Sequence, residues 1–238
     1  MSPARAAARS LSRTMAVGKG ARTKQKIVDA ALQLFREHGY EATTMRMVAE
    51  QAGVSLGNAY YYFKSKDLLL QAFYLEVHEA FVAGARPVLE RERRFDARLR
   101  GTMSAWLDAI EPYHRFSALL FRSAADPDSP LNPFHPDGAE VRKAGEAVFA
   151  EVVAGSTAKP GKALAGELPR LLWTYMMGTL LFWIYDRSDG RAATRALAER
   201  TVELIATAVK LAGNPLLRPF QRRVLALLRD LHPGSAVS

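Results

Sequence analysis

The sequence predicts an all-α protein, in which a small N-terminal three-helix head is followed by a larger helical body. Apolar residues recur at intervals of three and four along most of the chain, while strand-like alternation is nearly absent. Glycine, proline, serine and threonine stand where the helices would begin and end. With 238 residues, 49% of them hydrophobic and 24% charged, the chain has the length and composition of a small folded domain joined to a larger one.

Basic charge is concentrated near the N-terminus. Residues 1–70 hold 11 basic and 5 acidic side chains and therefore carry +6 of the formal net charge of +9. Such an excess suits a polyanionic partner, because each neutralised phosphate releases a counterion, although a solvated basic face would look the same. Residues 1–20 contain no acid and are rich in Ala, Arg and Ser, so we expect a disordered basic arm there. Met15 is a second possible start of translation.

Three helices are predicted in the head, each bounded by a residue that starts or ends a helix. They span residues 23–38, 45–52 and 56–62. Gly39 and Gly53 follow the first two helices, and glycine readily adopts the left-handed conformation that ends a helix. The residues that can cap the second and third helices are Thr43 or Thr44, and Ser55.

The body is also predicted to be helical. A fourth helix is expected to stop near Ala85, because Pro87 cannot easily continue it. Further helices are predicted at residues 96–110, 113–124, 139–154, 166–185, 191–211 and 216–231. The longest apolar run, Leu171–Tyr185, has about 15 residues, fewer than the ~20 that a membrane-spanning helix needs, so we expect a buried helix and no membrane partner.

The segment Met45–Phe63 has the pattern of a helix-turn-helix. Two helices that cross steeply need a small residue at their closest approach, and Ala49 supplies it. The turn needs a residue that tolerates positive φ, and Gly53 supplies it four positions later. Apolar residues fill the small core between these helices: Val48, Ala52, Val54 and Ala59. Small, turn and apolar positions therefore all fit one motif.

From about Ala21 to Leu70 the chain resembles the tetracycline-repressor (TetR/AcrR) family. The stretch TKQKIVDAALQLFREHGYEATTMRMVAEQAGVSLGNAYYYFKSKDLL follows the family pattern, including Gly-Tyr after the first helix and the run Tyr-x-x-Phe-x-x-Lys. The resemblance implies a helix-turn-helix DNA-binding domain over residues 21–66 and a helical ligand-binding and dimerisation domain over residues 67–238.

The resemblance also implies a function. The expected function is that of a sequence-specific DNA-binding transcriptional regulator, located in the bacterial cytoplasm and associated with the nucleoid. The protein would bind double-stranded DNA at a palindromic operator as a homodimer. A small hydrophobic or aromatic effector would release it, so repression would be the default state. The sequence leaves open whether it activates instead, and it does not reveal the effector, the operator or the regulated genes.

Within that resemblance, Leu56–Tyr62 is the recognition helix, which enters the major groove of DNA. Asn58 can contact adenine or a phosphate, and Gly57 permits close approach to the bases. Leu56 stands where many relatives have Lys or Arg, so we expect apolar contact with a thymine methyl in place of a guanine contact.

Three successive tyrosines end this helix and cannot all face inward. Tyr60 and Tyr61 offer rings to thymine methyls and hydroxyls to phosphates, although Tyr60 fits a core role equally well, and we expect Phe63 in the core. The residues expected to contact the DNA backbone are Thr43, Thr44, Ser55, Tyr62, Lys64 and Lys66. Basic residues just before the first helix fit either the minor groove or a solvated tail: Lys19, Arg22 and Lys24.

The body is expected to hold an effector pocket and a dimer interface. Aromatic and apolar residues at helical spacing are usually core, but their number favours a cavity. The residues predicted to line it are Trp106, Ile110, Tyr113, His114, Phe116, Phe149, Trp173 and Met177. The residues predicted in the dimer interface are Tyr175, Thr179, Trp183, Leu197, Thr201, Leu204 and Ala208. A helix after Pro215 would extend this interface or pack back on the body.

The sequence argues against an enzyme. It has no phosphate loop, no Gly-x-Ser-x-Gly and no His-Glu-x-x-His, and it contains no cysteine that could act as a nucleophile or metal ligand. Its five histidines lack metal-ligand spacing, so we expect neither a metal nor a cofactor. Two other interpretations stay open: a non-specific architectural DNA-binding protein, and a regulator controlled by a protein partner without any cavity.

Overall fold

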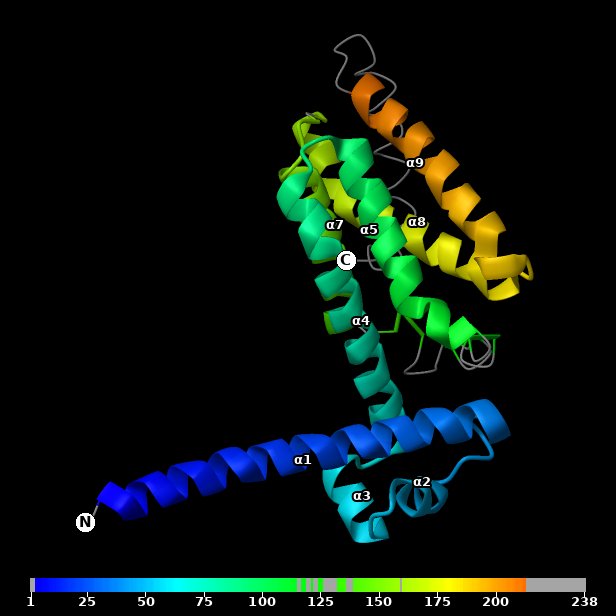
Figure 1. Ribbon diagram of the computed structural model, residues 1–238. Helices are drawn as coiled ribbons and strands as arrows, with labels where there is room; N and C mark the ends of the chain where they lie inside the picture. The colour runs from blue at the N-terminus through cyan, green and yellow to red at the C-terminus, as the bar shows by residue number, and fades with distance from the viewer. Residues whose placement is uncertain are drawn as a thin grey trace, which may run out of the picture. The chain divides into compact units, whose positions relative to one another are not determined.

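The computed structural model describes residues 3–114, 117–118, 121, 124–125, 132–135, 139–158 and 160–212, with side chains from residue 20 onward except 162 and 163. Every regular element in these ranges is a helix, which confirms the predicted all-α fold (Figure 1). The chain forms two compact units: residues 1–76 with 115–136, and residues 77–114 with 137–238. The predicted helix at 216–231 and the predicted pocket residue Phe116 lie outside the described residues.

The first unit contains α1 (Pro3–His38), α2 (Met45–Ala52), α3 (Leu56–Tyr62) and the start of α4 (Lys66–Arg91). Helix α1 packs against α2, and α2 packs against α3 (Figure 1). Their buried apolar residues include Ile27, Ala31, Leu34, Phe35, Val48, Ala49, Ala59 and Phe63. The buried set includes Val48 and Ala59, which the helix-turn-helix pattern predicts as core, whereas Ala52 and Val54, predicted with them, are half-buried.

Helix α1 begins much earlier than predicted. The disordered arm expected over residues 1–20 is instead helical from Pro3 onward, where the prediction began the helix at Thr23. The reason is composition, because Ala, Arg, Leu and Met are strong helix formers. Proline is tolerated in the first turn, where no intrahelical N–H bond is lost. The later glycines weaken the helix without ending it.

Local signals set the boundaries of the head helices. Gly39 and Gly53 adopt positive φ values of 87° and 66°, and the Gly39 N–H donates to the Phe35 carbonyl at 3.1 Å. The Thr44 hydroxyl accepts from the Met47 N–H at 3.2 Å, so Thr44 is the residue that caps α2. The Ser55 hydroxyl caps α3 in the same way, which fixes the start of the predicted recognition helix.

The second unit contains the rest of α4 and a set of packed helices. These are α5 (Phe95–Ile110), η1 (Glu111–Tyr113), α7 (Ala139–Ala154), α8 (Lys162–Tyr185), η3 (Asp189–Arg191) and α9 (Ala192–Leu211). Helix α5 packs against α7 and α9, and α7 packs against α8. The largest fully buried side chains of this second unit include Phe81, Leu99, Met103, Phe149, Leu172 and Trp183.

Prolines interrupt these helices less than predicted. Helix α4 continues through Pro87 to Arg91, although the prediction ended it near Ala85. The proline ring fixes φ close to its helical value, so continuation costs one backbone hydrogen bond and some crowding. Burial of Leu89 beyond the proline helps to offset that cost. No helix in the described ranges is long and apolar enough to span a lipid bilayer.

The turn between α8 and α9 is held by a buried carboxylate. Asp186 is 6% exposed and accepts hydrogen bonds from the backbone N–H and hydroxyl groups of Ser188 and Thr194, at 2.6–2.8 Å. Burial opposes ionisation of Asp186, but these hydrogen bonds outweigh it and hold its pKa below the usual range. The charged carboxylate thereby satisfies N–H groups near the start of α9.

Candidate nucleic-acid interface

Helix α3 is attached to the head by one side and exposed on the other. Ala59 is fully buried and Phe63 is 3% exposed, which confirms Phe63 as a core residue. On the outer side, Tyr60 and Tyr61 are 42% and 74% exposed, and a Cβ added at Gly57 would meet no atom within 4 Å. Leu56 and Asn58 are half-buried at the edges of this outer side. The recognition helix predicted from the sequence is therefore presented outward.

The three tyrosines have different surroundings. Tyr60 and Tyr61 lie on the outer side, so Tyr60 is available for contact and is not a core residue. The rings of Tyr61 and Tyr62 meet edge to face, with centroids 5.2 Å apart. Tyr62 is half-buried, and a Cβ at Gly20 of α1 would lie 3.5 Å from its hydroxyl. The Tyr61–Tyr62 contact therefore restrains an exposed ring before any ligand binds.

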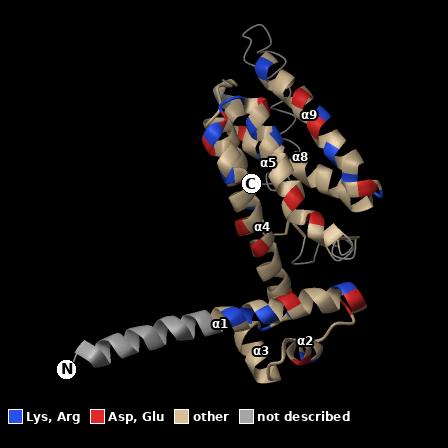
Figure 2. Cartoon of the chain, in the orientation of Figure 1, with Lys and Arg blue, Asp and Glu red and all other residues tan. Residues whose placement is uncertain are grey.

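Exposed basic residues surround α3. Figure 2 shows basic residues along the described part of α1. Among them, Lys24 lies over the Phe63 ring, with Nζ 5.7 Å from the centroid, and Arg22 is exposed. Lys64 is exposed directly after α3. Arg46, which is not among the predicted contact residues, is exposed in the first turn of α2. Its place in the first turn of α2, two positions after the N-cap Thr44, is the signal in the sequence that could have identified it.

Thr43 is buried and does not take the predicted position at the DNA-facing surface. Its side chain is 1% exposed, and its hydroxyl donates to the Gly39 carbonyl at 2.7 Å. A buried hydroxyl with that partner locks the turn after α1 and cannot reach a phosphate. Thr44 is exposed at the start of α2, where free backbone N–H groups favour an anion. Of these two threonines, only Thr44 therefore remains a predicted phosphate contact.

Lys66, predicted to contact the DNA backbone, makes structural contacts within the head. Its ammonium donates to the Tyr40 carbonyl at 2.8 Å and lies 4.3 Å from the centroid of the Tyr40 ring. The Tyr40 hydroxyl in turn donates to the Asp67 carboxylate. Burial and this hydrogen bond raise the pKa of Tyr40, so its hydroxyl stays protonated. Together these contacts tie the start of α4 to the turn after α1.

Most residues predicted to line an effector pocket are packed in the body. Trp106, Ile110, Phe149 and Trp173 are buried, whereas Tyr113, His114 and Met177 are half-buried. Trp173 lies so close to Gly145 of α7 that a Cβ there would be 2.8 Å from its ring. The ring of His114 meets that of Trp183 edge to face at 4.8 Å, and His114 Nε2 lies 2.8 Å from the Trp183 carbonyl. The structure thus places four of these residues in the core and leaves the other three partly exposed.

The α8 residues predicted in the dimer interface are buried or half-buried. Trp183 is 1% exposed and its indole N–H donates to Glu111 at 3.3 Å, while Thr179 is buried. The half-buried Tyr175 donates its hydroxyl to the Ala198 carbonyl at 3.3 Å. All three therefore pack within their own body. Because α8 is apolar nearly all round, spacing alone did not show which side is outward.

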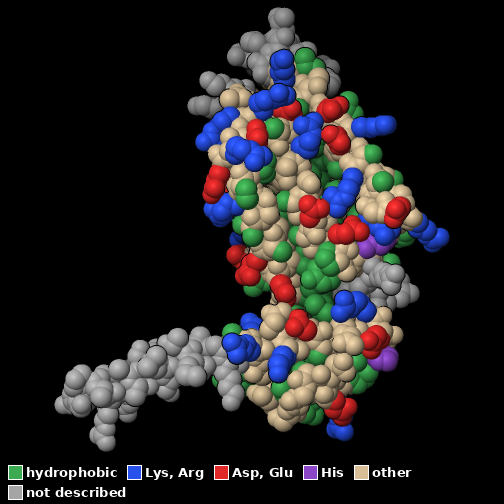
Figure 3. Space-filling view, viewed as in Figure 1, with side chains coloured by type: hydrophobic (Ala, Val, Ile, Leu, Met, Phe, Trp, Pro, Cys, Tyr) green, Lys and Arg blue, Asp and Glu red, His purple; other side chains and the backbone are tan. Residues whose placement is uncertain are grey.

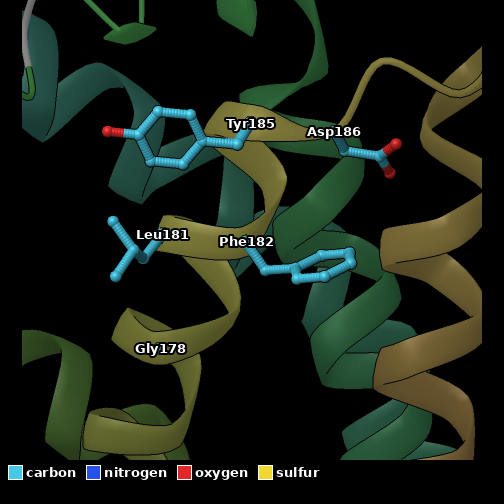
Figure 4. A pocket seen from close by; sticks show the side chains of 5 residues that line it. All are labelled: Gly178, Leu181, Phe182, Tyr185 and Asp186. Atoms are coloured by element: carbon cyan, nitrogen blue, oxygen red, sulfur yellow. The ribbon is translucent and has the colours of Figure 1, made fainter.

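A different set of apolar residues forms the outer side of α8. An open hollow of about 440 Å³ is lined by Gly178, Leu181, Phe182, Tyr185 and Asp186 (Figure 4). Leu181 and Tyr185 project from one side of the helix, and Phe182 and Asp186 project from the other. On α9, the predicted residues Leu197, Leu204 and Ala208 are exposed, and Thr201 is half-buried. The hollow contains none of the predicted effector-pocket residues.

Charge on the body is mixed. On the face shown in Figure 3, acidic and basic side chains are interspersed over the body. Ion pairs contribute to this pattern, including Arg195 with Asp108 at 2.9 Å and Arg170 with Glu167 at 3.0 Å. Among the described residues, no three side chains come together as a metal site. A helix-turn-helix head, followed by a body whose described regular elements are all helices, is typical of helix-turn-helix DNA-binding regulators.

Comparison with known proteins identifies the family within that class. Residues 27–73 match the family described as bacterial regulatory proteins of the tetR family. Residues 98–225, more than half of the chain, match the tetracyclin repressor-like C-terminal domain. The chain therefore belongs to the TetR family of transcriptional regulators and is not an enzyme.

Individual relatives match parts of the chain. The HTH-type transcriptional regulator in the dhlA 5′ region of Xanthobacter autotrophicus is 54% identical over 48 residues, 20% of this chain and 24% of that protein. SrpR of Pseudomonas putida is 32% identical over 106 residues, 44% of this chain and 48% of SrpR. The chain thus spans less than half the length of these relatives.

Solved structures extend the likeness to most of the fold. FadR of Bacillus subtilis, in complex with stearoyl-CoA, aligns with a TM-score of 0.62 at 19% identity. The alignment covers 76% of this chain and 97% of FadR. At that identity the likeness shows the fold alone.

Proposed function

We propose that this protein represses transcription by binding a palindromic DNA operator as a homodimer, and that a small hydrophobic effector releases it. The observation that supports this proposal is that α3 is held on one side and exposed on the other. Buried Ala59 and Phe63 hold the helix, while Tyr60 and Tyr61 face outward. A short helix held in this way can enter the major groove with its side chains already placed.

Phosphate contacts would come from the residues around α3. Exposed basic side chains flank it on three elements: Arg22 and Lys24 on α1, Arg46 on α2, and Lys64 after α3. Thr44 and Ser55 stand at the starts of α2 and α3. These contacts orient the head on the duplex and strengthen binding at low salt, without specifying sequence.

A second copy of the chain is the partner proposed for the apolar faces of α8 and α9. Leu181, Phe182 and Tyr185 are exposed on α8, and Leu204 is 71% exposed on α9. An exposed apolar face of this kind on two consecutive helices favours a four-helix contact between copies. A dimer would present two α3 helices about one helical turn of DNA apart, ~34 Å, which a palindrome requires.

The effector is proposed to be largely apolar. Four of the predicted pocket residues are buried, Trp106, Ile110, Phe149 and Trp173, so a cavity lined by them would have to open to admit a ligand. An apolar molecule could replace the contacts that are lost. FadR of Bacillus subtilis, which shares this fold, was solved with stearoyl-CoA. Long-chain acyl-CoA is therefore a reasonable first probe, with simple aromatic compounds as a second set.

Selection of bound sequences from random duplex DNA tests the DNA-binding proposal. We expect one palindromic site whose binding survives excess random DNA. Tyr61→Ala should weaken that binding by roughly tenfold or more, since base contacts contribute ~1–3 kcal/mol each. Val141→Ala, at an exposed position of α7, is the matched control and should bind normally. Enrichment of no sequence would reject specific regulation and favour an architectural DNA-binding protein.

Sedimentation equilibrium tests the dimer. Phe182→Glu places a charge on the outer side of α8 and should yield folded monomers that bind the operator weakly. Val141→Glu is the control, because it adds the same charge to an exposed position on α7. A Phe182→Glu protein that remains dimeric would place the interface elsewhere.

A further inference from the structure

Helix α3 carries no charged side chain. Its seven residues are Leu-Gly-Asn-Ala-Tyr-Tyr-Tyr, and Figure 2 shows this helix without a basic or acidic residue. The commonest base-specific contact in the major groove is a bidentate bond from Arg or Lys to guanine. Helix α3 cannot make that contact, although basic residues surround it. Its base recognition must therefore depend on other chemistry.

The side chains that α3 does offer fit the two bases of an A·T pair. Asn58 carries an amide that can pair with N6 and N7 of adenine. Leu56 and the exposed rings of Tyr60 and Tyr61 present apolar surface, and the thymine 5-methyl is the apolar group of the major-groove edge. Ala59 and Phe63 are buried, so neither competes for this role.

Gly57 is an unusual choice within this helix. Its φ is not in the positive range that would require glycine, and a Cβ would meet no protein atom within 4 Å. Glycine is less favourable than alanine inside a helix. Nothing in the chain itself therefore requires glycine on the outer side of α3. A partner that contacts the helix backbone would require it, because a Cβ would hold that partner away.

We infer that α3 reads thymine 5-methyl groups, with one methyl in van der Waals contact with the backbone at Gly57 and others against Leu56 and the tyrosine rings. The half-site beneath α3 is accordingly made of A·T pairs. This inference rests on the proposed function and adds the chemical class of sequence that the site recognises. Phosphate contacts from Lys24, Arg46 and Lys64 are compatible with it, since they carry no sequence information.

Thymine-to-deoxyuridine replacement tests the inference directly, because it removes the methyl and keeps every hydrogen-bonding group. The operator obtained by random selection is synthesised with one thymine position changed in both half-sites at a time. Positions beneath α3 should lose affinity about fourfold per methyl, and so about fifteenfold for the symmetric pair. Thymines elsewhere in the same duplex should show no effect and serve as the internal control.

Gly57→Ala tests whether the glycine is needed for close contact between the α3 backbone and DNA. The variant should be at least as stable as the parent, with a thermal midpoint higher by roughly 1–4 °C, because alanine favours the helix. It should nevertheless bind the operator roughly tenfold more weakly, and it should discriminate less between thymine and deoxyuridine at one position. Gly166→Ala in α8, where a Cβ would also meet no atom within 4 Å, should match its stability gain and leave DNA binding unchanged.

The outcomes distinguish this inference from the function on which it depends. Specific operator binding that is indifferent to every deoxyuridine replacement would overturn methyl recognition and leave the regulator intact. A selected half-site rich in G·C pairs beneath α3 would do the same. Failure to enrich any sequence would instead overturn the proposed function.

Discussion

Arg98 is the clearest place where the structure predicts the cost of a substitution. Its side chain is 3% exposed on α5, and burial lowers the pKa of its guanidinium. It donates to the backbone carbonyls of Leu89 and Glu92 at the end of α4, and of Glu151 and Val152 at the end of α7. One cation thereby satisfies the terminal carbonyls of two helices, where the helix dipole is negative.

The magnitude follows from those four acceptors. In Arg98→Met the carbonyls of Glu92 and Glu151, which are partly exposed, can regain water. The buried carbonyls of Leu89 and Val152 lose their partner, at ~1–3 kcal/mol each. Removal of a buried cation offsets part of this loss, so we expect a net destabilisation of about 3–4 kcal/mol. For a chain of this size that lowers the thermal midpoint by about 6–16 °C.

Urea and thermal unfolding of a double-mutant cycle measure the effect. Arg91→Met is the control and should cost less than about 0.5 kcal/mol, because Arg91 is 73% exposed. Gly155→Ala should also destabilise, because its Cβ would overlap the Arg98 guanidinium. In an Arg98→Met background that overlap is relieved, so the two costs should not add. An Arg98→Met loss below about 1 kcal/mol, or strict additivity, would refute this reasoning.

Three further predictions follow from single side chains. Asp186→Asn should lower the free energy of unfolding by about 1–3 kcal/mol at pH 7. The difference from the parent should shrink as pH falls below about 4, because the charged carboxylate stabilises the fold only above its unfolded pKa. Urea titrations from pH 3 to 7 check this, and a constant difference would contradict it. Lys64→Ala should reduce the salt slope of operator affinity by about one per half-site and leave base preference unchanged, as measured by fluorescence anisotropy. Asn58→Ala should instead relax preference at one base position by ~1–3 kcal/mol, and an unchanged selected motif would rule out that contact.

The head was predictable from sequence because its signals are local. Helices α2 and α3 begin and end at the predicted residues, since Gly39, Gly53 and Ser55 determine the boundaries within a few positions. The start of α1 was not predictable in that way, because no residue before Thr23 forbids a helix. In the body, which side of the apolar helix α8 faces inward depends on its packing against α7 and α9, and periodicity within α8 carries no such information.

Lys66 and Arg98 together show how α4 is held. At its start, Lys66 and Asp67 bind the turn after α1 through Tyr40; at its end, Arg98 binds the carbonyls of Leu89 and Glu92. Between these two sets of contacts α4 is a continuous helix of 26 residues, about 39 Å long. Lys66 thereby joins the start of α4 to the turn that precedes α2. For that reason Lys66 is a poor reporter of phosphate contact, and Lys64, which is exposed beside α3, is the better one.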